Sequence, residues 1–155
     1  MSRFEPRLAA LGYEASAAPN TVCLKNSTAS KALPVQWLAG LAGDRARNPE
    51  LSLAHAVAFG DNPMGNDQPL TLFADHGMPF VSVASHAALE QQALPPGLAS
   101  LHVGGLEHGS AAVLSRLVQE WRAAGEGTSW RPSDTLETVC AAARAEQAKA
   151  AQSQL

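Results

Sequence analysis

Apolar residues spaced three and four apart alternate along the chain with short apolar runs, and this pattern predicts helices alternating with strands. Residues 3–11 predict a short helix, and residues 13–16 and 21–25 predict two short extended stretches. A longer helix follows a polar cluster at residues 27–30. It is predicted by four apolar residues that fall on one helical face: Leu33, Trp37, Leu38 and Leu41.

The rest of the chain continues this alternation. The almost wholly apolar run at residues 54–59 predicts a strand buried on both faces, as in a parallel sheet. Further strands are predicted at residues 79–83 and 98–103, and further helices at residues 67–77, 85–92 and 110–124. A last, Ala-rich helix begins near Ser133 and Asp134, and its composition predicts little contribution to the core. The expected fold class is therefore α/β with a parallel sheet and flanking helices.

Composition and charge narrow the classes of function. The 155 residues are 46% hydrophobic and 16% charged, which suits one folded domain. A formal net charge of −3 disfavours nucleic acid as a partner, because such an interface needs clustered Lys and Arg. The sequence shows no membrane-spanning run and no secretory signal, and Cys23 and Cys140 have no metal-ligand spacing. We therefore expect a cytoplasmic protein with reduced thiols.

An acidic loop directly follows the apolar run at residues 54–59. It reads Gly60-Asp-Asn-Pro-Met-Gly-Asn-Asp67, and ligands of open parallel sheets bind beyond the carboxyl ends of the strands. The loop offers the oxygen ligands that Mg²⁺ prefers, from Asp61, Asp67, Asn62 and Asn66. The residues alone leave another interpretation open, in which Asp67 caps the next helix and the remainder forms ordinary turns.

Lys31 is the second candidate, at the start of the predicted helix after residues 27–30. A solvated surface lysine is the usual finding at such a position. A positive charge is nevertheless unfavourable beside a helix N-terminus, because the helix dipole is positive there. A nearby anion such as a phosphate would explain the placement.

These segments together resemble haloacid-dehalogenase (HAD) phosphatases of the Cof type. Ser30-Lys-Ala-Leu, with Trp37-Leu38 behind it, resembles the family's Ser-Lys-Gly-X-Ala-Leu…Leu stretch, and the acidic loop resembles its Gly-Asp-X-X-Asn-Asp metal motif. The downstream order is also similar, through Met78-Pro-Phe-Val-Ser-Val-Ala84 and Glu107-His-Gly-Ser-Ala-Ala-Val-Leu114. The resemblance covers residues 13 to 122, which is most of the chain.

Two departures from the family pattern change what the resemblance implies. The acidic loop has two extra residues before Asn66-Asp67, which is similar to phosphomannomutases, and the family's nucleophile motif Asp-X-Asp occurs nowhere. The resemblance thus implies the end of a cap domain at residues 1–26, the C-terminal half of a Rossmann-like core at 27–124, and a linker with a helix at 125–155. The strand at residues 54–59 should then have an open edge, to be covered by a missing N-terminal half or in a homo-oligomer.

The resemblance also implies a role for each candidate residue. Asp61 would hold Mg²⁺ with support from Asp67, and Lys31 would offset charge on the nucleophile and the phosphoryl group. Asn62 and Asn66 would contact the substrate. The implied activity is Mg²⁺-dependent hydrolysis of a phosphorylated small molecule such as a sugar phosphate, with little or no turnover by this chain alone. The alternatives are a phosphomutase, a non-catalytic relative that binds or regulates, and an unrelated α/β domain.

Overall fold

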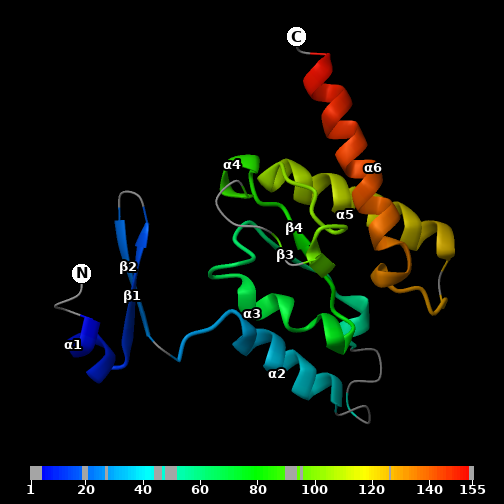
Figure 1. The fold of residues 1–155 in the computed structure, drawn as a ribbon. Coiled ribbons are helices and arrows are strands. Elements are labelled where there is room, and N and C mark those ends of the chain that lie inside the picture. The colour runs from blue at the N-terminus through cyan, green and yellow to red at the C-terminus, as the bar shows by residue number, and fades with distance from the viewer. Residues whose placement is uncertain are drawn as a thin grey trace.

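A computed structural model describes residues 5–18, 21–26, 28–43, 47, 52–89, 94, 96–125 and 127–153. The N-terminal unit consists of α1 (Glu5–Ala10), β1 (Tyr13–Ala18) and β2 (Thr21–Asn26). The two strands pair antiparallel with Tyr13 opposite Asn26, which confirms the predicted extended stretches as a hairpin. Figure 1 shows this hairpin set apart from the elements that follow.

A small parallel sheet lies at the centre of the remaining chain. β3 (Ala58–Gly60) pairs in parallel with β4 (Phe80–Ser82), and a single bridge joins Ser82 to His102 on the other side of β4. The mixed α/β class with a parallel sheet and flanking helices is therefore confirmed. The remaining elements are α2 (Ala32–Gly43), η1 (Leu53–His55), α3 (Gln68–Thr71), η2 (Ala74–His76), α4 (His86–Leu89), η3 (Pro96–Leu98), α5 (Leu106–Ala124) and α6 (Pro132–Gln152).

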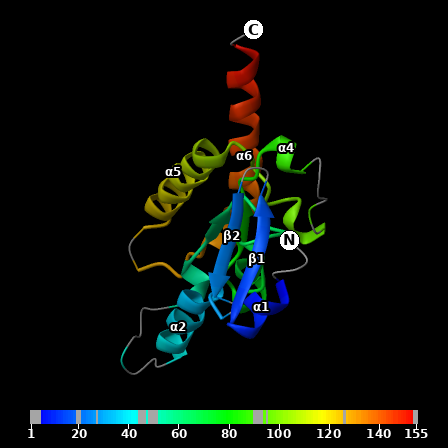
Figure 2. The same cartoon turned by 90° about the vertical axis from the view of Figure 1, so that its left-hand side faces the viewer.

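The two faces of this sheet pack against different helices, with α5 and α6 on one side and α2 on the other (Figures 1 and 2). The larger core cluster joins β4 to α5 and α6 and consists of Val81, Val83, Val103, Val113, Leu117, Leu136, Val139, Cys140 and Ala143. On the other face Ala58 packs against a smaller cluster of Ala32, Phe73 and Met78. Each fully buried Val or Leu contributes about 1.5–3 kcal/mol, so the α5–α6 side carries most of the stability.

The strands are shorter than the sequence predicts. Residues 53–55 form a 3₁₀ turn instead of a strand, because the Ser52 hydroxyl accepts a hydrogen bond from the Ala54 N–H at 3.2 Å. β3 is half-buried, whereas β4 is fully buried. The predicted third strand at residues 98–103 is reduced to the bridge at His102, because the Leu101 N–H bonds within a turn to the Leu98 carbonyl at 3.1 Å.

The helices also depart from the prediction in part. The helix expected at residues 67–77 is divided into α3 and η2, and α5 starts four residues earlier than expected. The helix expected at residues 85–92 is seen as α4, and residues 90–92 lie outside the described residues. The prediction that the last helix adds little core was wrong, because Leu136, Val139 and Cys140 of α6 are buried. Within the described residues, no helix has the length and apolar character needed to cross a bilayer.

Candidate functional site

The acidic loop folds back on itself directly after β3. The Asn62 carbonyl accepts hydrogen bonds from the N–H groups of Gly65, at 3.0 Å, and Asp67, at 3.1 Å. The Gln68 N–H then bonds to the Gly65 carbonyl at 3.2 Å and leads into α3. These backbone bonds bring residue 67 back against residue 60, so the two ends of the loop meet at the carboxyl end of β3.

Asp67 is the centre of this loop and is only 1% exposed. One carboxylate oxygen, Oδ2, accepts a hydrogen bond from the Asn62 N–H at 2.9 Å, and the other, Oδ1, accepts from the Lys31 ammonium in an ion pair. Asp67 stands at the N-cap position of α3, yet its side chain makes no capping hydrogen bond. Asp67 therefore has the N-cap position that the alternative interpretation gave it, but its carboxylate binds Lys31 and the Asn62 N–H instead of capping α3.

Gly60 makes the close packing of this carboxylate possible. A Cβ added at Gly60 would lie 2.5 Å from Asp67 Oδ2 and 2.7 Å from a ring carbon of Phe80. Real Cβ atoms do not approach other atoms so closely, so any side chain at position 60 would displace one of these groups. Because Gly60 has no side chain, the Asp67 carboxylate can occupy the space beside the end of β3.

Lys31 reaches Asp67 from the segment that precedes α2, 36 residues away in sequence. A turn at Ser30 directs this segment, because the Ser30 hydroxyl accepts from the Ala32 N–H at 3.1 Å and the Ser30 carbonyl accepts from the Leu33 N–H at 3.1 Å. The Lys31 side chain is 51% exposed, whereas that of Asp67 is 2% exposed. The Asp67 carboxylate is therefore the nearby anion that explains why a lysine is found at the start of a helix.

The other candidate side chains lie on the surface on two sides of this ion pair. Asn66 lines a groove of about 670 Å³, to which Lys25, Ser30, Lys31 and Gln68 also contribute polar side chains. Asp61 is exposed and lines a separate hollow of about 310 Å³. The structure therefore joins Lys31 with Asp67, while Asp61 and Asn66 open into different hollows. The Asn62 side chain is exposed and lies against Gly65.

The hollow beside Asp61 contains a second carboxylate that the sequence did not single out, that of Glu107 in the first turn of α5. Three successive residues with positive φ lead the chain into α5, namely Gly104, Gly105 and Leu106, the last at +49°. A leucine in this region is uncommon and costs backbone strain, which is often found near functional sites. The Gly104-Gly105 pair before Glu107 is the sequence signal that marks this position.

The described residues contain no group of three or more His, Cys, Asp or Glu side chains able to hold a metal ion. Asp61 and Glu107 thus form a pair of acidic side chains in one hollow. Comparisons of the chain with protein-family models, curated proteins and solved structures gave no match. The function must therefore be argued from the geometry alone.

Proposed function

We propose that this chain supplies the lysine and the acidic metal motif of a Mg²⁺-dependent phosphohydrolase site of the HAD type, which acts on a phosphate monoester such as a sugar phosphate. The observation that carries the proposal is the buried Asp67 carboxylate. It pairs with Lys31 through one oxygen and with the Asn62 N–H through the other, at the carboxyl end of a parallel strand. That is where open α/β sheets bind ligands.

The acidic residues at this strand end fit a magnesium ion. Mg²⁺ uses one or two protein carboxylates and completes its shell with water and phosphate oxygens. The exposed Asp61 would hold the ion, and Glu107 lines the same hollow. Both oxygens of Asp67 are already engaged and the residue is buried, so Asp67 supports the site through Lys31 and the loop. A bound Mg²⁺ would neutralise charge on the phosphate.

Lys31 is suited to bind the phosphoryl group. Asp67 holds the ammonium group through a single oxygen, and half of the lysine side chain remains exposed, so further N–H donors are available. Asn66 and Gln68 add amide groups to the groove beside Lys31 and would contact the rest of the substrate. Phosphoryl transfer depends mainly on such positioning and on electrostatic stabilisation.

The proposed site is incomplete in this chain because the sequence contains no Asp-X-Asp nucleophile motif. The proposal therefore includes a partial Rossmann-like core, located in the cytoplasm and completed by a segment that carries the nucleophile. The chain alone is expected to hydrolyse phosphate esters poorly or not at all. A non-catalytic relative that binds a phosphorylated ligand is the second candidate, and the missing nucleophile favours it.

Metal binding and turnover test the proposal separately. Titration with Mn²⁺ as a Mg²⁺ substitute, followed by electron paramagnetic resonance, should give one site that weakens at least about tenfold in Asp61→Asn. Asp75→Asn, which changes an exposed carboxylate outside the loop, is the matched control. Equal binding by all three proteins would contradict the metal site.

Hydrolysis of p-nitrophenyl phosphate with Mg²⁺ is then measured with and without an upstream Asp-X-Asp segment supplied in trans. Turnover that requires the segment, Mg²⁺ and Lys31 supports the phosphohydrolase. Metal binding without turnover under every condition supports the non-catalytic relative instead.

A further inference from the structure

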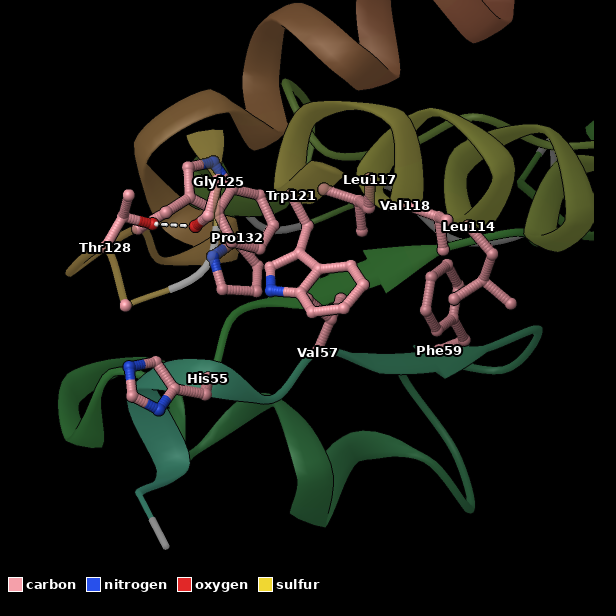
Figure 3. Close-up of a pocket in the computed structure, with 12 residues that line it drawn as sticks. His55, Val57, Phe59, Leu114, Leu117, Val118, Trp121, Gly125, Thr128 and Pro132 are labelled. Carbon is pink, nitrogen blue, oxygen red and sulfur yellow. Dashed lines mark hydrogen bonds between the residues drawn. The ribbon is translucent and has the colours of Figure 1, made fainter. Parts of the chain in front are cut away.

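An apolar groove of about 470 Å³ runs between the outer side of β3 and the overlying helix α5 (Figure 3). Val57 and Phe59 point upward from its floor, and Leu114, Val118 and Trp121 point down from α5 (Figure 3). Gly125 and Thr128, which follow α5, and Pro132, the first residue of α6, close one end of the groove. The Thr128 hydroxyl donates to the Gly125 carbonyl at 3.1 Å.

β3, whose side chains form the floor of this groove, also has a backbone edge that faces away from β4. The Ala58 N–H donates to the Pro79 carbonyl at 2.9 Å, and the Gly60 carbonyl accepts from the Val83 N–H at 2.9 Å, so both residues face β4. Backbone groups of alternate residues point to opposite sides of a strand, and those of Phe59 therefore face away from β4. In the part of the chain that the structure describes, they make no hydrogen bond.

The side chains of α5 that line the groove are also left uncovered by the other described residues. Leu114 is 49% exposed, Val118 41% and Trp121 54%, although all three lie on one face of α5. Single exposed apolar residues are normal, but a contiguous apolar surface beside an unpaired strand edge marks an interaction site. Among the residues that the structure describes, this sheet consists of two strands and one further bridge, and a sheet of so few strands is marginally stable without added pairing.

We propose that this groove binds an extended segment of a partner chain, which adds as a further strand to the free edge of β3. The backbone of the segment would pair with the N–H and C=O of Phe59. Its side chains at every second position would be apolar and lie beneath Leu114, Val118 and Trp121. A helix or a lipid chain fills apolar volume but satisfies no strand edge, whereas a peptide backbone does both.

A second copy of this chain is a poorer occupant. Antiparallel pairing of β3 with its own copy places the two-fold axis perpendicular to the sheet. Both copies of α5 would then lie on the same face of the joined sheet and compete for the same groove. The partner segment must therefore carry no such helix over its strand. The inference uses only the β3 edge and the groove, so it stands or falls independently of the proposed metal site.

Selection from a displayed library of random ten-residue peptides tests the proposal on the purified chain. The expected result is a peptide with apolar residues at alternate positions, whose affinity falls about tenfold or more in Leu114→Lys. Leu33→Lys on α2 is the matched control, since Leu33 is 51% exposed and outside the groove, and it should leave the affinity unchanged. Asp61→Asn should also leave it unchanged.

Backbone methylation of the selected peptide then separates strand addition from simple apolar contact. N-methyl groups at one set of alternate positions should abolish binding, whereas the same groups at the other set should have little effect. Equal tolerance of both sets, or no peptide that depends on Leu114, overturns the proposal. Sedimentation that shows a dimer broken by Leu114→Lys also overturns it, in favour of a second copy.

Discussion

The ion pair between Lys31 and Asp67 should respond unequally to the loss of each partner. Asp67→Asn leaves the half-exposed Lys31 free to extend into water, and the amide oxygen can still accept from the Asn62 N–H. Lys31→Met leaves a carboxylate with 2% side-chain exposure without its counter-ion. We therefore expect the lysine variant to be the less stable of the two, although the lysine is the more exposed residue.

The burial of the two side chains sets the magnitude of this difference. Asp67→Asn removes a charge from a hydrogen bond and breaks a pair that is half in water, which costs about 1 kcal/mol. Lys31→Met leaves the buried Asp67 carboxylate without a counter-ion, which costs about 3 kcal/mol. The variant that carries both changes should be close to Asp67→Asn alone, because no buried charge remains. The coupling energy of the pair is then about 3 kcal/mol in magnitude.

Urea denaturation followed by circular dichroism measures these free energies of unfolding. In thermal denaturation of a chain of this length, the difference of about 2 kcal/mol between the two single variants corresponds to a difference in Tm of about 4–8 °C. Lys25→Met is the matched control, because Lys25 pairs with Glu14 at 3.1 Å where both side chains are more than half exposed, and its loss should cost under about 1 kcal/mol. If Asp67→Asn proves as costly as Lys31→Met, the carboxylate does not depend on the lysine and the reasoning is wrong.

Three further predictions concern other parts of the fold. Gly60→Ala should lower the free energy of unfolding by about 1–3 kcal/mol in urea denaturation, because its Cβ would overlap the Asp67 carboxylate; an unchanged value would contradict the close packing. Burial raises the pKa of the Cys140 thiol from 9.0 to about 11. The unfolded thiol therefore loses its proton first, so stability should fall as pH rises from 9 to 11, and this fall should be shallower in Cys140→Ala. Arg144→Met should speed hydrogen exchange at the Val103 N–H, because Arg144 donates to the His102 carbonyl at 2.6 Å; exchange as slow as in the parent would argue against that role.

The sequence predicted elements whose signal is local. The paired strands at residues 13–18 and 21–26 agree with the two extended stretches predicted there, and α5 follows from a long amphipathic repeat. The strand at residues 54–59 was placed too early because an apolar run does not reveal that the Ser52 hydroxyl holds a 3₁₀ turn. The contribution of α6 was missed because its Ala-rich composition gives a weak apolar pattern overall. Four of its residues nevertheless belong to the larger core cluster, namely Leu136, Val139, Cys140 and Ala143.

The sequence predicted which residues belong to the candidate site better than it predicted how they are arranged. The sequence indicated Lys31 and the acidic loop, and the structure brings Lys31 and Asp67 together. It did not indicate that Asp67 is buried and fully engaged while Asp61 is exposed, because both are loop aspartates of the same type. Burial depends on the path of the whole loop, and Glu107 enters the Asp61 hollow only through the packing of α5.

The contact between Gly60 and the Asp67 carboxylate also restricts how this sequence can change over time. A side chain at position 60 needs the volume that the carboxylate occupies, so neither residue can change freely while the other is kept. Homologous sequences should therefore vary at the two positions together, with Asp67 replaced by a smaller residue wherever Gly60 has gained a side chain. Lineages that keep the aspartate should keep the glycine too.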